Sequence, residues 1–121
     1  MSAPSILVVE DEALVALDLE YTLEDMGWRV AGSMGGVLSA LAWLNGRDAG
    51  PDAALLDVNL GGEMVFPVAE ALALRQIPFA FATGYADLVS ESDYAHAPVL
   101  TKPVDQDRLR EVLATMRVNA A

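Results

Sequence analysis

The sequence predicts an α/β fold, a doubly wound, five-stranded parallel sheet with helices on both faces. Short apolar runs alternate along the chain with segments whose apolar residues recur at helical spacing. This alternation is typical of α/β folds built on a parallel sheet. The chain has 121 residues, of which 54% are hydrophobic, and this suits one domain with one substantial core. We therefore expect a single domain over residues 1–121.

Five apolar runs are the expected strands. They cover residues 6–9, 28–31, 53–56, 79–82 and 98–101, and the second run is the weakest. Between the first two strands, four apolar residues fall on one helical stripe, namely Ala16, Leu19, Leu23 and Met26. Gly27 follows as the helix stop, because glycine readily takes the left-handed conformation that ends many helices.

Three further segments are expected to form regular helices. Val37, Leu41 and Leu44 share one face of the second helix. Pro67 suits the first turn of the third helix, where its missing N–H costs nothing. Asp105 can cap the last helix, whose apolar stripe consists of Leu109, Val112, Leu113 and Met116.

The segment from 86 to 97 should contain the fourth helix, but its sequence supports one poorly. Ser90, Ser92 and Asp93 are weak helix formers. The apolar residues of the segment keep no clean helical period. We therefore expect the fourth helix to be short or mobile.

Charge and composition exclude several classes of function. The formal net charge of −11 repels nucleic acids and anionic membranes, so neither is an expected partner. The chain has no cysteine and therefore no disulfide, which is compatible with the cytoplasmic location that we expect. The first residues lack the basic and apolar regions of a signal peptide. No apolar run approaches the roughly 20 residues of a membrane span.

Reactive side chains follow four of the expected strands. An acidic triplet at 10–12 follows the first strand, Asp57 the third, Thr83 the fourth, and Lys102, the only lysine, the last. Ligands of open parallel sheets bind outside the carboxyl ends of the strands. If these runs are parallel strands, then carboxylates, a hydroxyl and an ammonium group meet at one edge of the sheet.

Each of these residues also has an ordinary structural explanation. Acidic residues favour helix N-termini, where they meet free amides and the helix dipole. Asp57 suits a turn, Thr83 a strand end, and a lone lysine is usually solvated. Their joint placement favours a site instead, because two carboxylates about 4 Å apart repel by roughly 4 kcal/mol at an effective dielectric constant near 20. A cation would relieve that repulsion.

Magnesium is the cation that this set of residues predicts. It takes oxygen ligands in octahedral geometry and keeps several waters. Asp11, Asp57 and a carbonyl of the turn after Asp57 would suit it, and Glu10 could hold a metal-bound water. Asp57 could then attack a phosphoryl group, since carboxylate nucleophiles that form aspartyl phosphate are established in covalent catalysis. Lys102 would supply a point charge and Thr83 a hydroxyl donor for the transferred group.

The chain resembles the receiver domains of response regulators over nearly its whole length. The segments that carry the resemblance are 6–12 (ILVVEDE), 55–57 (LLD), 82–84 (ATG) and 102–103 (KP), in that order. Each is weak alone, but together they are highly specific. The resemblance implies a flavodoxin-like receiver fold with strand order 2-1-3-4-5, an order for which a receiver is a known example.

The resemblance also implies a function for the strand-end residues. Asp57 would accept a phosphoryl group from a sensor histidine kinase or a histidine phosphotransfer protein. Glu10, Asp11, Asp57 and the Asn59 backbone carbonyl would serve Mg²⁺, and Thr83 and Lys102 would contact the phosphoryl group. Phosphorylation would then change the binding of a downstream protein target. The bond between Lys102 and Pro103 is expected to be cis, as in the family.

Two features of the chain depart from the common receiver pattern. Receivers often carry an aromatic residue on the last strand that rotates inward when phosphate binds, and the strand expected at 98–101 has none. The run at 81–85 (FATGY) resembles a subgroup of mostly stand-alone receivers that also lack this aromatic residue. In that subgroup Tyr85 is the natural substitute switch. The second departure is the glycine pair at 61–62, where many receivers have proline, and the same subgroup often has this pair.

Two other functions are compatible with parts of the pattern. A magnesium-dependent phosphatase of the haloacid dehalogenase type also uses a strand-end aspartate, but it needs a second aspartate two residues later, where this chain has Asn59. A phosphate-independent adaptor would need none of the reactive residues. The complete set favours a signalling switch that is not an enzyme, except for its own phosphorylation and dephosphorylation. Phosphatase turnover on small substrates would favour the phosphatase, and full activity of an Asp57→Ala variant would favour the phosphate-independent adaptor.

Overall fold

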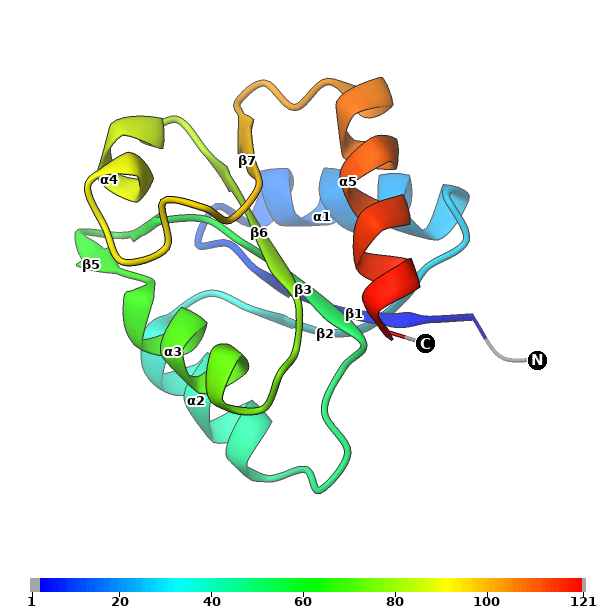
Figure 1. The fold of residues 1–121 in the computed structure, drawn as a ribbon, viewed down its shortest axis with the longest axis horizontal. Coiled ribbons are helices and arrows are strands. Elements are labelled where there is room, and N and C mark those ends of the chain that lie inside the picture. Colours follow the sequence, from blue (N-terminus) through cyan, green and yellow to red (C-terminus); the bar gives the residue numbers. More distant parts are fainter. Residues whose placement is uncertain (1–2, 121) are drawn as a thin grey trace.

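A computed structural model describes residues 3–120 of the protein, with side chains described as far as Arg117. In chain order the elements are β1 (Ser5–Val9), α1 (Ala13–Asp25), β2 (Arg29–Met34), α2 (Val37–Asn45), β3 (Ala53–Leu56), β4 (Asn59–Leu60), β5 (Glu63–Met64), α3 (Phe66–Leu74), β6 (Phe79–Thr83), α4 (Ala86–Ser90), β7 (Val99–Thr101) and α5 (Gln106–Ala120). Helices lie on both sides of a central sheet (Figure 1).

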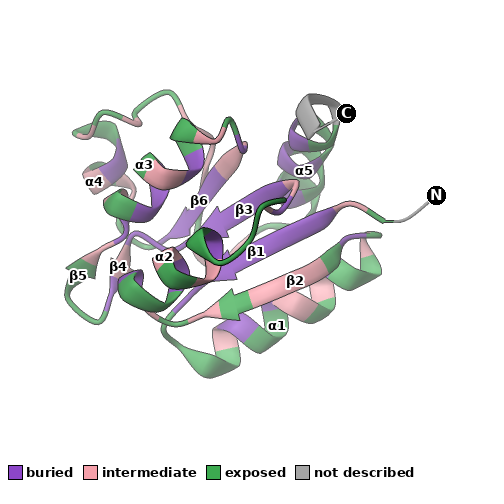
Figure 2. Cartoon of the chain, turned by 90° about the horizontal axis from the view of Figure 1, so that it is seen from below, coloured by how far each residue is buried: buried purple, intermediate pink, exposed green. Residues whose placement is uncertain are grey.

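The central sheet confirms the predicted fold class. Its five parallel strands have the order β2-β1-β3-β6-β7, which is the predicted order 2-1-3-4-5 once the short hairpin β4–β5 is set aside. The inner strands are purple in Figure 2 because their residues are buried on both faces. Such strands appear in a sequence as continuous apolar runs, and this explains why they were predictable.

Alternate residues of each inner strand face two separate hydrophobic clusters. Leu7 and Val9 pack with α2, α3 and α4, whereas Ile6 and Val8 pack with α1 and α5. This alternation follows from the two-residue period of a strand. The helices therefore cover both faces, and the carboxyl ends of the strands remain free at one edge.

The second strand differs from its prediction. It spans Arg29–Met34 rather than 28–31, and Trp28 lies before it in the core beside α1. β2 is an edge strand that pairs only with β1, and none of its residues is fully buried. It therefore needs no continuous apolar run. Gly32 faces the Trp43 ring so closely that a Cβ atom there would lie 2.8 Å from it.

The connections show two further outcomes of the sequence predictions. Gly27 ends α1 with φ +90°, as expected of a helix stop, and the Lys102–Pro103 bond is cis. The turn at 59–62 was expected, but the antiparallel hairpin β4–β5 that surrounds it was not. Gly61 and Gly62 form its tip with φ values of +64° and +95°, which only glycine adopts easily.

The fourth helix is short, as predicted. α4 covers only Ala86–Ser90, and turns occupy most of the segment that follows it up to β7. The predicted mobility of the segment concerns motion and stays a prediction. Within residues 3–120, none of the helices combines the length and the apolar character needed to cross a membrane.

Candidate functional site

The ends of four parallel strands bring the predicted residues to one edge of the sheet. The backbone fixes their positions, because the Asp57 amide donates to the Val9 carbonyl at 2.8 Å and the Lys102 amide to the Thr83 carbonyl at 3.0 Å. Glu10 and Asp57 thus stand at adjacent strand ends, with Lys102 one strand beyond Thr83. The parallel sheet therefore brings together side chains that lie far apart in the sequence.

Lys102 joins the two buried carboxylates of the site. Its ammonium group lies 2.5 Å from Glu10 Oε2 and 3.0 Å from Asp57 Oδ2. The side chains of Glu10 and Asp57 are only 1% and 7% exposed, and that of Lys102 is 22% exposed. Buried charges persist only when they are paired, so this arrangement requires the lysine.

Burial and pairing shift the pKa values of two of these groups. Burial raises the pKa of Glu10, and hydrogen bonds from Lys102 and the Glu12 amide offset only part of that rise. For Lys102, burial lowers the pKa, but hydrogen bonds to Glu10 and Asp57 and the charges of both carboxylates outweigh it. The net pKa of Lys102 is therefore raised, which keeps its ammonium group charged at neutral pH.

A cluster of carboxylates beside Lys102 fits a divalent cation. One carboxylate oxygen from each of Glu10, Asp11 and Asp57 lies within 4.8 Å of the others. Among the described residues, Asp57 Oδ1 is buried and accepts no hydrogen bond. A buried acceptor without a partner calls for an explanation, and an ion is one. A set of oxygen donors is also the set that Mg²⁺ prefers.

Asn59 lies at the wall of the site, where its side chain shapes the turn. Its Oδ1 accepts a hydrogen bond from the Gly62 amide at 2.7 Å, across the tip of the β4–β5 hairpin. With Asp11, Asp57 and Lys102 it lines a polar pocket of about 500 Å³. The amide side chain is committed to the turn, which is compatible with a ligand role for the backbone carbonyl alone.

Thr83 lies in the interior beside the site and not on the wall of the polar pocket. Its side chain is fully buried and does not line the polar pocket. Thr83 Oγ1 accepts a hydrogen bond from the Tyr85 amide at 2.9 Å. Gly84 and Tyr85 line the pocket instead, and the Tyr85 side chain is exposed. This hydrogen bond connects the Thr83 hydroxyl to the loop that leads into α4.

Sequence reasoning missed two parts of the site that act through the backbone. The Glu12 amide donates to Glu10 Oε1 at 3.1 Å and thereby orients the buried carboxylate. Gly61 lies beside Asp11, since a Cβ atom at Gly61 would be in ordinary van der Waals contact with Asp11 Oδ2, at 3.7 Å. The glycine pair was the only sequence signal for this turn beside Asp11, and backbone amides carry no signal at all.

Comparison with known proteins decides the family. The family model for the response regulator receiver domain matches residues 6–114. The chain belongs to this family. Receiver domains are components of two-component signalling and typically act as regulators rather than enzymes, and they interact with kinases or downstream targets. The acidic cluster and Lys102 described above lie within the matched residues.

Individual relatives support this assignment of the receiver. Sensory transduction protein LytT of Bacillus subtilis is 31% identical over 115 residues, which are 89% of this chain and 46% of that protein. The receiver thus spans about half the length of this curated relative. The solution structure of SdrG from Sphingomonas melonis Fr1 is 48% identical with a TM-score of 0.82, and the match covers 97% and 99% of the two chains. A BeF₃-activated conformation of SdrG, from Pseudomonas melonis Fr1, is 47% identical with a TM-score of 0.77 and coverage of 96% and 98%.

Proposed function

We propose that this receiver domain, over residues 1–121, is a phosphorylated switch in a cytoplasmic two-component system. Asp57 accepts a phosphoryl group from a sensor histidine kinase or a histidine phosphotransfer protein, and the phosphorylated form binds a downstream protein differently. The observation that carries this proposal is the state of Asp57. One of its oxygens is held by Lys102, and the other is buried without a partner beside Glu10 and Asp11.

The transfer step needs little from the protein beyond position and charge. An Asp57 carboxylate oxygen forms a bond to phosphorus while the bond from phosphorus to the donor histidine nitrogen breaks. The electron pair of that bond stays on the imidazole, which takes up a proton. Lys102, held near Asp57 before transfer, neutralises part of the charge on the transferred group. Phosphoryl transfer depends mainly on such positioning and charge stabilisation.

Asp11, Asp57 and the Asn59 carbonyl are proposed to hold Mg²⁺, with Glu10 bonded through a water or placed behind the ligands. When bound, the ion neutralises charge on the carboxylates and on the phosphoryl oxygens. Glu10 is already bonded to Lys102 and the Glu12 amide, which favours an indirect role for it. The partnerless Asp57 Oδ1 is the atom that an ion would satisfy.

Thr83 and Tyr85 are proposed to report the phosphorylation. Thr83 does not line the polar pocket, so its hydroxyl must move to reach a phosphoryl group there. Any such movement changes its hydrogen bond with the Tyr85 amide. The run 81–85 (FATGY) supports the receiver's membership of the subgroup that this run resembles. Its relative SdrG has a BeF₃-activated conformation, and we propose that this receiver responds similarly.

Neither alternative explains the site as well. A phosphatase needs an acid or base two residues after Asp57, but Asn59 cannot donate or accept a proton there and its Oδ1 is bound in the turn. A phosphate-independent adaptor gives no reason for three clustered carboxylates. We therefore propose that the receiver turns over no external substrate.

Incubation with acetyl phosphate and Mg²⁺ tests the proposed chemistry. Intact mass should show one phosphoryl group, and peptide mapping after borohydride reduction should place it on Asp57. The adduct should be absent when a chelator removes Mg²⁺. An adduct that forms equally well with the chelator, or that maps to another residue, would refute the proposed site.

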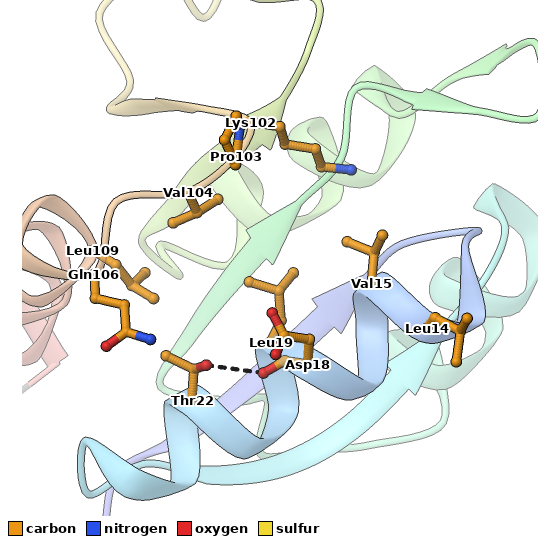
Figure 3. A pocket seen from close by; sticks show the side chains of 10 residues that line it. All are labelled: Leu14, Val15, Asp18, Leu19, Thr22, Lys102, Pro103, Val104, Gln106 and Leu109. Carbon is orange, nitrogen blue, oxygen red and sulfur yellow. Dashed lines mark hydrogen bonds between the residues drawn. The ribbon is translucent and has the colours of Figure 1, made fainter.

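An apolar groove next to the site suits the donor protein. The groove has a volume of about 600 Å³ and lies between α1 and the stretch from Lys102 to Leu109. Figure 3 shows Leu14, Val15 and Leu19 of α1 on one side and Pro103, Val104 and Leu109 on the other. Lys102 lines both the groove and the polar pocket, so the two are adjacent. We propose that a helix of the phosphodonor protein docks here.

A single substitution in the groove should separate docking from chemistry. Leu14 is 83% exposed, so Leu14→Gln leaves the core intact. If a donor helix covers Leu14, its loss costs about 1.5 kcal/mol of binding, or roughly tenfold in transfer rate at subsaturating donor. Phosphorylation by acetyl phosphate should be unchanged. The control is Leu74→Gln on α3, which is 79% exposed on the opposite face. An equal loss with acetyl phosphate, or with the control, would contradict donor docking.

A further inference from the structure

Four aromatic rings connect the segment after α4 with the strands and loops of the site. The Tyr94 ring stacks on Phe66 with centroids 6.0 Å apart and an interplanar angle of 13°. It meets Phe79 edge to face at 5.7 Å. Phe81 in turn lies 6.1 Å from Phe66 and 5.6 Å from Phe79. Phe66, Phe79, Phe81 and Tyr94 are called the aromatic cluster below.

Tyr94 is the point at which the segment 91–97 is attached to the core. Ser92 Oγ donates to the Val89 carbonyl at 2.7 Å and accepts from the Tyr94 amide at 3.1 Å. The Ala97 amide donates to the Tyr94 carbonyl at 2.9 Å. These local bonds make the segment one compact unit, and its large apolar contact is the Tyr94 ring. In Figure 1 the segment is the yellow loop between α4 and β7.

The β4–β5 hairpin and strand β6 lie beside the phosphorylation site, and each leads to a member of the aromatic cluster. Phe66 begins α3 one residue after the β4–β5 hairpin, which starts two residues after Asp57 and lines the polar pocket. The Val65 amide closes the base of that loop by donating to the Val58 carbonyl at 2.9 Å. Phe81 lies two residues before Thr83 on β6 and therefore on the same face of the strand.

We propose that Tyr94 is a latch that holds segment 91–97 on Phe66 and Phe79, and that phosphorylation of Asp57 shifts the segment toward an undocked state. The inference rests on the proposed function and adds a regulatory element to it. The Thr83 hydroxyl must move to reach the phosphoryl group, and this displaces the loop at Tyr85. Only the five residues of α4 separate Tyr85 from the segment, so the displacement reaches the latch.

The latch has a thermodynamic consequence that a purely structural role lacks. If phosphorylation favours undocking, then undocking must favour the phosphorylated state by the same factor. Docking then lowers the affinity for a phosphoryl mimic, because only part of the population is ready to bind it. Removing the Tyr94 ring should therefore raise that affinity, even though it removes contacts from the core.

The experiment measures the affinity of the full chain for beryllofluoride with Mg²⁺, by calorimetry or by NMR titration. Tyr94→Ala should bind about fivefold tighter than the wild type, at the low end of typical couplings between sites. Tyr94→Phe keeps the ring and should match the wild type. Tyr94→Leu serves if the alanine variant does not fold, and should bind tighter as well. Affinity equal to the wild type in the alanine or leucine variant would overturn the latch, as would tighter binding by Tyr94→Phe.

Hydrogen exchange of the wild-type chain gives a second, mutation-free measurement. Beryllofluoride should increase the exchange of the amides at 91–97, including the Ala97 amide that bonds to Tyr94. Unchanged exchange there would overturn the latch alone. If the wild type binds no beryllofluoride, or if Asp57→Asn binds it equally well, the proposed function fails and the latch with it.

Discussion

An Asp57→Asn variant should accept no phosphoryl group from either acetyl phosphate or a histidine kinase. Asparagine has the same shape but lacks the anionic oxygen that would bond to phosphorus. It can still accept a hydrogen bond from Lys102, now 3.0 Å from Asp57 Oδ2. Intact mass after incubation with acetyl phosphate and Mg²⁺ measures the outcome. The site should thus lose its chemistry without losing its shape.

The stability of the same variant provides the control for folding. Glu10, Asp11 and Asp57 place carboxylate oxygens within 4.8 Å of one another. Two such charges about 4 Å apart repel by roughly 4 kcal/mol at an effective dielectric constant near 20. Without Mg²⁺, Asp57→Asn should therefore unfold at the same or a higher temperature than the wild type. A variant that unfolds earlier, or that gains a phosphoryl group, would contradict the role of Asp57.

A Lys102→Met variant should show the second large effect, on both stability and phosphorylation. The substitution leaves Glu10 and Asp57 buried without their shared cation. Removing one partner of a buried ion pair costs about 3 kcal/mol or more. Mg²⁺ should restore part of this loss, because it supplies another cation to the same carboxylates. Urea unfolding with and without Mg²⁺ measures both changes.

The phosphorylation rate of Lys102→Met should fall by about 100-fold, as expected when one charge-stabilising group is lost from a transfer site. Lys102→Arg retains the charge but in a larger, planar group, so its phosphorylation rate should lie between those of the wild type and Lys102→Met. The matched control is Arg108→Met on α5, an exposed cation whose nearest carboxylate, that of Glu111, lies 3.8 Å away. Equal effects of the Lys102 and Arg108 substitutions would mean that net charge, and not the site, causes the change.

The inner strands and the meeting of the strand ends were predictable because both follow from short-range rules. Strands buried on both faces give continuous apolar runs, and parallel strands bring their carboxyl ends to one edge. Glu10, Asp57 and Lys102 therefore came together as expected. The edge strand β2 was misplaced because a strand paired on one side needs no apolar run.

Other parts of the site depend on tertiary contacts that leave little trace in the sequence. No local pattern shows that the Thr83 hydroxyl is bonded to the Tyr85 amide rather than lining the pocket. The β4–β5 hairpin was not predicted, since its strands have only two residues each. The contact of Tyr94 with Phe66 joins residues on different elements, and neither residue belongs to a recognisable motif.

Phosphotransfer from a purified histidine kinase tests the central claim most directly. The kinase is first labelled on its histidine with γ-³²P-ATP, and the receiver is then added with Mg²⁺ while the label on each protein is followed over time. The account predicts that label leaves the kinase and appears on the wild-type receiver, and that neither the Asp57→Asn variant nor the wild type with a chelator gains label. Label that appears on Asp57→Asn, or that reaches the wild type without a divalent ion, would contradict it.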